Sequence, residues 1–206
     1  MAGRRSAQDA LTTRDSILRK AADIATVDGL EGVTIGRLAT DLDMSKSGVI
    51  GQFGSKEELQ LATLERLLGT FRERVWDPVQ HLQPGLPRLL AICESWAHYE
   101  GHPEFEGGCG VAQVSFEFDG RPGRVHDALA TALKRWRRTL VADITTAVEA
   151  GDLPADTDPQ QVAFSLDALA SGMNTARLLH GDTDSGSWAL AAMHAVLGIK
   201  RAPASS

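Results

Sequence analysis

Apolar residues recur at three- and four-residue intervals along nearly the whole chain, and this spacing constrains the fold more than any other feature of the sequence. No stretch alternates apolar and polar residues with the β-branched and aromatic enrichment that is typical of strands. The first helical stripe consists of Ile17, Ala21, Ile24 and Ala25. The sequence therefore predicts an all-α protein of about nine helices.

Glycine, proline and capping residues set the predicted helix ends. Thr12 or Thr13 caps the first long helix, and Gly29 ends it, because glycine adopts the left-handed conformation at low cost. Residues 1–11 are expected to form a loose arm. The predicted helices cover about residues 14–28, 35–42, 46–53, 56–76, 86–100, 109–118, 122–150, 158–180 and 186–198.

Composition and charge narrow the class of protein. Of the 206 residues, 43% are hydrophobic and 23% are charged, which suffices for a globular core. No apolar run approaches the roughly 18–20 residues that cross a bilayer, and Arg4 and Arg5 precede no apolar stretch that would make a secretory signal. The sequence predicts a cytoplasmic protein without a membrane partner, and the sparse cysteines, Cys93 and Cys109, agree with that compartment.

The net charge of −6 argues at first against a nucleic-acid partner, but the local balance matters more. Residues 1–60 contain 8 basic and 9 acidic residues, so this segment is nearly neutral and has no broad basic stripe. If it binds DNA, each subunit neutralises few phosphates, and a second subunit is needed for useful affinity.

Two short predicted helices, joined by a tight turn at Asp43-Met44, have the pattern of a helix-turn-helix. Thr34 and Ser45 cap them, and Ser55 opens a capping box that runs to Glu58. A helix that enters a major groove about 12 Å wide needs small residues on its outer face. The outer face offers Lys46, Ser47, Gly48, Gly51 and Gln52, and the inner face offers Val49, Ile50 and Phe53.

The ordered motifs from about residue 13 to 67 resemble the tetracycline-repressor (TetR) family of regulators. These motifs are Gly-Val-Thr from Gly32, Leu-Ala from Leu38, Met-Ser-Lys-Ser from Met44, Phe53, and Ser-Lys-Glu-Glu-Leu from Ser55. A Gly-Gly-Cys stretch, residues 107–109, resembles one subgroup of that family. The resemblance implies an N-terminal helix-turn-helix domain over 1–55, a helical ligand-binding and dimerisation domain over 56–200, and a disordered tail over 201–206.

The resemblance also implies residue roles at the DNA. Lys46 and Ser47 fall where the family reads base edges, and Thr34, Gln52 and Lys56 fall where it holds phosphate. The chain departs from the family pattern at Gly36, Ile50 and Gly51, where arginine, tyrosine and an aromatic residue or histidine are common, so we expect Arg37, Gln52 or the arm residues Arg4 and Arg5 to compensate. The alternatives are that Thr34 and Ser55 only cap helices and that Lys46 and Lys56 are solvated surface residues. The expected DNA-binding residues are Thr34, Arg37, Ser45, Lys46, Ser47, Gly48, Gly51, Gln52 and Lys56.

The last two predicted helices are candidates for a homodimer interface. Two reading helices must reach successive major grooves, about 34–36 Å apart. Small side chains in these helices allow close helix packing between subunits, although the same residues would also suit the core of one subunit. The expected interface residues are Leu166, Leu169, Ala170, Met173, Ala189, Ala192 and Val196.

A largely apolar effector is expected among the middle helices, because ligand pockets are mostly apolar with a few polar groups. Ordinary core packing is the alternative for each lining residue. Cys109, near a helix start, is either an oxidant or electrophile sensor or a small apolar residue. The expected lining is Trp96, Tyr99, Phe105, Cys109, Phe116, Trp136, Met173, Asn174 and Arg177.

Sequence motifs for catalysis and metal binding are missing from the chain. It contains no G-x-S-x-G elbow, no P-loop and no H-E-x-x-H. His98 and His102 have metal-type spacing, but Gly101 and Pro103 interrupt the helix and no third ligand is evident. We therefore expect no cofactor, no metal and no enzymatic activity. The sequence predicts a ligand-responsive repressor of a palindromic operator; the alternatives are a helical protein-interaction module or an enzyme.

Overall fold

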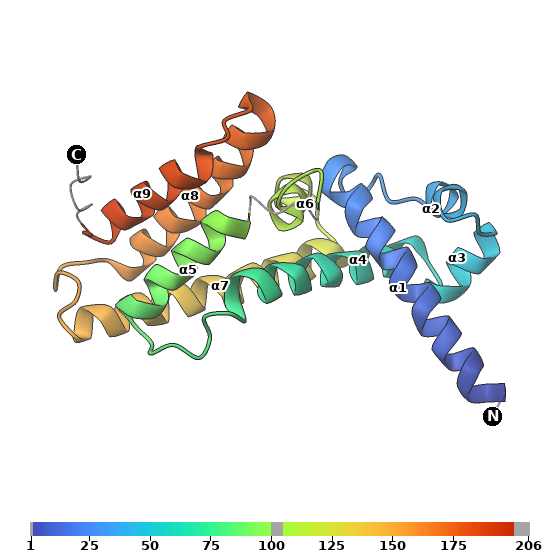
Figure 1. The fold of residues 1–206 in the computed structure, drawn as a ribbon, viewed down its shortest axis with the longest axis horizontal. Helices are drawn as coiled ribbons and strands as arrows, with labels where there is room; N and C mark the ends of the chain where they lie inside the picture. The colour runs from blue at the N-terminus through green and yellow to red at the C-terminus, as the bar shows by residue number, and fades with distance from the viewer. Residues whose placement is uncertain (1, 100–104, 200–206) are drawn as a thin grey trace. The chain divides into compact units, whose positions relative to one another are not determined.

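The computed structural model describes residues 2–99 and 105–199, with side chains from Asp9 onwards, and this part of the chain is helical with short connections (Figure 1). The predicted all-α fold is confirmed, since the described residues form nine α-helices and one π-helical turn. Among these helices, none combines the length and the apolar run needed to span a bilayer. The elements are α1 Ala2–Asp28, α2 Ile35–Asp41, α3 Lys46–Phe53, α4 Lys56–Phe71, the π-helical turn η1 Arg72–Trp76, α5 Leu86–Tyr99, α6 Gly110–Phe118, α7 Arg124–Glu149, α8 Pro159–His180 and α9 Ser185–Val196.

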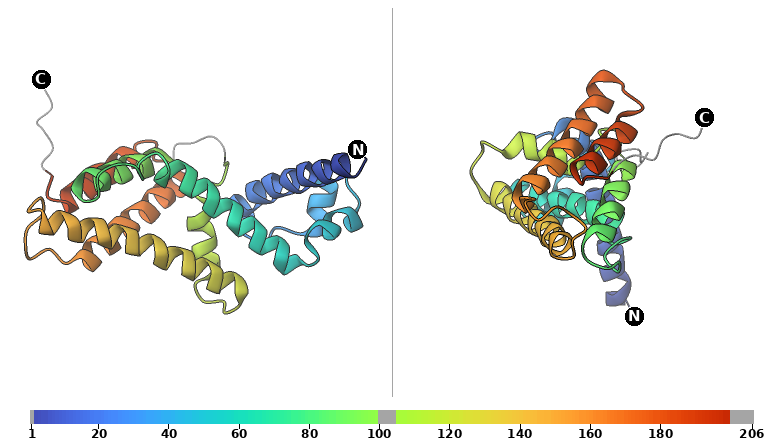
Figure 2. Two further views of the ribbon diagram at one scale, coloured as in Figure 1. Left: turned by 90° about the horizontal axis from the view of Figure 1, so that it is seen from below. Right: turned by 90° about the vertical axis from the view of Figure 1, so that its left-hand side faces the viewer.

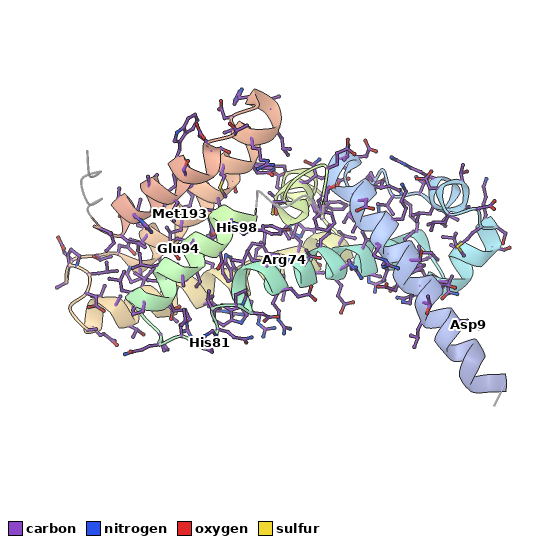
Figure 3. The ribbon with its side chains drawn as sticks, viewed as in Figure 1. Asp9, Arg74, His81, Glu94, His98 and Met193 are labelled. Atoms are coloured by element: carbon purple, nitrogen blue, oxygen red, sulfur yellow. The ribbon has the colours of Figure 1, made fainter. Side chains whose placement is uncertain are left out.

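The first helix differs most from its predicted bounds. It begins at Ala2 instead of near Arg14, so the predicted loose arm is wrong for residues 2–11. Thr13 does not cap a helix start, because its hydroxyl donates to the carbonyl oxygen of Asp9 one turn earlier, at 2.8 Å (Asp9 is labelled in Figure 3). The side chains of Arg4 and Arg5 and the predicted tail, residues 201–206, lie outside the described part.

Three predicted caps form as expected and fix where the short helices begin. Thr34 Oγ1 accepts from the backbone N–H of Arg37 at 3.2 Å, and Ser45 Oγ accepts from that of Gly48 at 3.0 Å. Ser55 Oγ accepts from the N–H of Glu58 at 3.1 Å. The Glu58 carboxylate, which a complete capping box returns to the Ser55 N–H, accepts instead from the Arg124 guanidinium at 2.6 Å.

The helices pack into two compact units, which follow packing and not the predicted division at residue 55. The N-terminal unit contains Met1–Thr70 and Glu104–Ala130, and the C-terminal unit contains Phe71–Pro103 and Thr131–Ser206. The chain leaves the N-terminal unit within α4, returns to it between residues 103 and 104, and leaves it again within α7. The division into residues 1–55 and 56–200 stays a prediction about which part binds which partner.

In the N-terminal unit, α1 packs against α2, α3 and α6. Its inward face is built of small and branched residues, among them Ile17 and Ala21, both fully buried. The loop before α6 approaches the end of α1 so closely that a Cβ on Gly107 would lie 2.0 Å from the carbonyl oxygen of Thr26. The predicted Gly-Gly-Cys stretch therefore serves this close backbone contact.

In the C-terminal unit, α8 and α9 lie side by side, and α5 packs against both (Figures 1 and 2). Asp158 caps α8 by accepting from the N–H of Gln160 at 2.8 Å, and Pro159 occupies the first helical turn as predicted. Gly181, in the left-handed conformation with φ of 74°, ends α8 before the short turn into α9.

Candidate functional site

Helix α3 has one anchored face and one exposed face. Val49 is fully buried against the unit, while Ile50 and Phe53 are half-buried. A Cβ added at Gly51 would meet no atom within 4 Å, so packing inside the chain does not require this glycine. The opposite face is open at Lys46, Ser47 and Gly51, and partly open at Gly48 and Gln52.

The C-terminal end of α3 is tied to α1 by Arg14. The Arg14 guanidinium donates to the backbone carbonyl oxygen of Gln52 and lies 4.2 Å from the centre of the Phe53 ring. A cation at a helix C-terminus also compensates the negative end of the helix dipole. No local pattern in the sequence points to Arg14, because its hydrogen-bond partner Gln52 lies 38 residues away in the chain.

The turn between α1 and α2 is held from two sides. On one side, the Glu117 carboxylate on α6 accepts from the backbone N–H groups of Leu30 and Glu31, at 2.7 and 2.9 Å. On the other, Gln60 of α4, itself buried, donates to the carbonyl oxygen of Leu30 at 3.1 Å. Gly29 has a φ of 71°, and a Cβ there would lie 2.4 Å from a Glu117 oxygen. The start of α2 is therefore fixed by α4 and α6.

Two of the three cations that were expected at DNA have carboxylate partners. Lys56 Nζ lies 2.8 Å from Glu31 Oε2, and the Arg37 guanidinium pairs with Asp28. Hydrogen bonds from Lys56 and then Gln60 lower the pKa of Glu31, so this carboxylate stays ionised near neutral pH. Lys46 has no carboxylate within 4.0 Å among the described residues.

The C-terminal unit contains a cluster of aromatic rings packed edge to face. The Trp136 ring centre lies 5.2 Å from that of Phe71 and 5.4 Å from that of Trp96, and Phe71 also contacts Tyr99. Trp76 joins at 6.4 Å from Trp136. The structure thus brings together Trp96, Tyr99 and Trp136, which the sequence pointed to, and adds Phe71 and Trp76, which it did not.

One polar atom of this aromatic cluster has no partner. The indole N–H of Trp136 is buried and makes no hydrogen bond within the described part of the chain. A buried donor without an acceptor is costly, so the site favours a hydrogen-bond acceptor beside this ring. The other expected lining residues are spread out: Met173 and Asn174 are buried in α8, Arg177 is exposed, and Phe105, Cys109 and Phe116 belong to the N-terminal unit.

The two cysteine thiols are both buried, and neither forms a disulfide. Burial, with a smaller contribution from Glu94, raises the pKa of Cys93 to about 12, so this thiol is protonated at neutral pH. Cys109 precedes the first residue of α6 and is 4% exposed. His98 borders a groove of about 450 Å³ with Arg74 and Glu94 (Figure 3); within the described residues no group of three metal-ligating side chains occurs, and His102 lies outside them.

Helices α8 and α9 expose large apolar side chains, but these are mostly not the residues expected at the dimer interface. Most of the expected interface residues are covered within one subunit, with Leu166, Ala170, Met173 and Ala189 buried, Leu169 and Ala192 half-buried, and Val196 exposed. Large apolar side chains exposed on these helices are Phe164, Leu178, Leu179, Trp188 and Val196. A groove of about 720 Å³ along α9 adds Leu190 and His194 to this surface.

The described residues form a helix-turn-helix in the N-terminal unit and further helices in the C-terminal unit, and a helix-turn-helix is a motif typical of DNA-binding regulators. The model of the tetracyclin repressor-like C-terminal domain matches residues 85–193, which is more than half of the chain. The chain therefore belongs to the tetracycline-repressor (TetR) family of transcriptional regulators.

The chain is also similar to individual proteins. The chain is similar to the HTH-type transcriptional repressor NicS of Pseudomonas putida, with 32% identity over 106 residues; the match covers 48% of this chain and 47% of that repressor, about half its length. The structure of a TetR transcriptional regulator from Chloroflexus aurantiacus has a TM-score of 0.84 at 20% identity, covering 93% of this chain and 96% of that one. The structure of AibR in complex with isovaleryl coenzyme A and operator DNA has a TM-score of 0.66 at 21% identity, covering 78% and 85%. The structural likenesses concern the fold.

Proposed function

We propose that this chain is a ligand-responsive repressor that binds operator DNA as a homodimer, with α3 as the reading helix. The observation that carries the proposal is the open face of α3, where Lys46 has no carboxylate partner among the described residues and stands beside Ser47 and Gly51. A cation and small polar groups on a slim helix match the donors and the clearance that a major groove requires.

Lys46 and Ser47 read base edges in this proposal, because they lie in the first turn of α3, which is the part of a reading helix that reaches deepest. Gly48 and Gly51 allow the backbone to approach the duplex. Ser45 caps α3, and Gln52 lies near the far end of this helix. In this proposal the Gln52 side chain contacts phosphate.

Thr34, Arg37 and Lys56 hold the phosphates beside the groove. The Thr34 hydroxyl oxygen already accepts from the Arg37 N–H, which leaves its own O–H free to donate to a phosphate oxygen. Lys56 and Arg37 bind DNA by exchanging their carboxylate partners for phosphate. The ion pairs that they give up are partly exposed, and such pairs contribute little to stability.

The dimer interface in this proposal lies on α8 and α9, at residues that one subunit leaves uncovered. Phe164, Leu179 and Trp188 are at least 58% exposed, and large apolar groups in this state favour burial against a second copy. Leu166 and Ala170 support these helices from inside the subunit, while Val196 contributes to the interface directly. A four-helix bundle from two subunits would bury this surface.

The effector is a largely apolar molecule with a hydrogen-bond acceptor, bound next to the aromatic cluster of the C-terminal unit. The unpartnered N–H of Trp136 supports this class, because an acceptor there would satisfy a buried donor. The complex of AibR with an acyl-CoA and operator DNA supports the pairing of a small ligand with DNA on this fold. A repressor needs only to bind its effector, so we propose no enzymatic activity. We also propose that the protein acts in the cytoplasm, where the DNA is.

Selection of duplexes from a random pool, followed by hydroxyl-radical footprinting, tests the proposal. We expect a palindromic site with two protected stretches of sugar-phosphate backbone about one helical turn, 34–36 Å, apart. A small-molecule screen by melting temperature then supplies ligands for release of that duplex. Binding with no preferred sequence, or protection of a single patch, contradicts the proposed dimeric repressor.

A further inference from the structure

Carboxylates around the turn between α1 and α2 pair with the cations beside α3. Asp28 ends α1 and Glu31 lies within the turn, and each pairs with a cation that the proposed function assigns to phosphate. We propose that Glu31, assisted by Asp28, suppresses binding to arbitrary DNA and so sets the specificity of the protein. This inference rests on the proposed function.

Glu31 is held in place for this role by more than its ion pair. Its Oε2 accepts from Lys56 Nζ at 2.8 Å, and its Oε1 accepts from Gln60 Nε2 at 3.1 Å. Gln60 is 6% exposed and also donates to the carbonyl oxygen of Leu30, so a buried amide orients the carboxylate. The Glu117 carboxylate fixes the backbone of Glu31 through the N–H at 2.9 Å.

Arg37 is neutralised in a similar way from both sides. Its guanidinium pairs with Asp28, and its Nε lies 4.0 Å from Asp41 Oδ2. Asp41 is also 3.3 Å from Lys20 Nζ, so cations and carboxylates alternate along this surface. Lys46 is the one basic residue of α3, and among the described residues it forms no ion pair with these carboxylates.

The ion pair of Lys56 and Glu31 lowers DNA affinity because it limits counterion release. A lysine that neutralises a phosphate releases condensed counterions and steepens the salt dependence of binding by about 0.9 in the log–log slope. Lys56 and Glu31 together carry no net charge, so the pair releases few counterions when it binds to DNA. Affinity for arbitrary sequence is therefore low, and base contacts from α3 supply a larger share of the affinity for the operator.

The test is the substitution Glu31→Gln, measured by fluorescence anisotropy on a random-sequence duplex and on the selected operator duplex across a salt series. The amide keeps an acceptor for Gln60 and removes the charge that holds Lys56. We expect the random duplex to bind about tenfold more tightly at low salt, with a slope steeper by about 0.9. The operator duplex should gain less than the random duplex, so the ratio of the two affinities falls.

Two further variants identify the cause. Glu65→Gln changes the net charge equally at an exposed position of α4 that has no cation partner within the described part, and it should leave the slope nearly unchanged. The double variant Glu31→Gln with Lys56→Gln should not bind the random duplex more tightly, because the tighter binding of Glu31→Gln depends on the Lys56 ammonium. A gain that persists without Lys56, or one that Glu65→Gln reproduces, overturns the inference.

The two levels of the proposal fail differently. If the wild-type chain selects an operator but Glu31→Gln leaves the random-duplex affinity and slope unchanged, the inference is wrong and the proposed function stands. If neither protein binds any duplex at low salt, both are wrong. Melting temperatures of all variants within about 2 °C of wild type, as expected for changes at exposed ion pairs, show that folding is not the cause.

Discussion

Ion pairs from the two units differ in how far they are buried. In the N-terminal unit, the pairs Lys56–Glu31 and Arg37–Asp28 lie at the surface beside α3. In the C-terminal unit, Asp143 is 1% exposed and accepts from both Arg88 Nε, at 2.8 Å, and Arg88 Nη2, at 2.6 Å. Exposed pairs exchange partners at little cost, whereas a buried bidentate pair cannot be opened without stranding a charge. The exposed pairs beside α3 can therefore change partners, whereas the buried pair of Arg88 and Asp143 is a permanent part of the C-terminal unit.

The largest effect is expected from Asp143→Ala in the C-terminal unit. This change leaves the Arg88 guanidinium without its carboxylate and also removes the acceptor near the N–H of Gly85, so unfolding free energy should fall by about 3–5 kcal/mol. Urea denaturation measures the loss. Asp156→Ala, at an exposed position, is the control and should be nearly neutral. A loss below that of an ordinary surface substitution would show that the buried pair is not structural.

A somewhat smaller effect is expected at the aromatic cluster. Trp96 is 7% exposed and contacts the rings of Phe71 and Trp136, so Trp96→Ala should destabilise the chain by roughly 3 kcal/mol. Trp188, 58% exposed on α9, is the matched control of the same residue type. Trp188→Ala should leave monomer stability nearly unchanged but weaken the dimer in sedimentation experiments. Equal stability losses for both tryptophans would contradict this division of roles.

A smaller effect is expected at the proposed reading helix α3, where substitutions should change DNA binding but not the stability of the fold. Lys46→Ala should weaken operator binding by about 1–3 kcal/mol, because a base-edge contact of this size is lost. Its melting temperature should stay close to that of the wild type, since Lys46 is exposed. Lys134→Ala, an exposed lysine of α7 in the C-terminal unit, supplies the control for net charge. Unchanged operator affinity for Lys46→Ala, measured by gel-shift titration, removes Lys46 from the site.

The smallest effect is expected at Arg14, which positions α3 without reaching the groove. Arg14→Met removes the hydrogen bond to Gln52 and the contact with Phe53, and should cost about 1 kcal/mol of stability. Operator binding should weaken while the salt slope stays constant, because no phosphate contact is lost. Arg14→Lys should restore part of the affinity, since a cation remains at the C-terminus of α3. A reduced salt slope for Arg14→Met would instead mark Arg14 as a phosphate contact.

Local chemistry explains what the sequence predicted well. Thr34, Ser45 and Ser55 each cap the helix that follows, and Gly29 takes the left-handed conformation, because these preferences depend on neighbouring residues only. The outer and inner faces of α3 follow from its spacing in the same way. The start of α1 was missed because Thr13 bonds back along the helix, an alternative that is open to any threonine.

Tertiary contacts explain what the sequence missed. The pairing of Lys56 with Glu31 spans 25 residues, and that of Glu117 with the turn at Leu30 spans 87, so neither leaves a periodic signal. Small residues on α8 suited both a subunit interface and a subunit core, and periodicity alone does not separate the two. The structure places Leu166 and Ala170 in the core and leaves Phe164 exposed.

Site-specific photo-crosslinking tests the central claim most directly. A crosslinking amino acid in place of Ser47, on the open face of α3, should attach to the selected operator duplex, and excess unlabelled operator should suppress the reaction. The same amino acid in place of Ser187, on α9, should not attach. A protein that binds the operator but crosslinks from position 187 and never from position 47 would contradict the assignment of α3 as the reading helix.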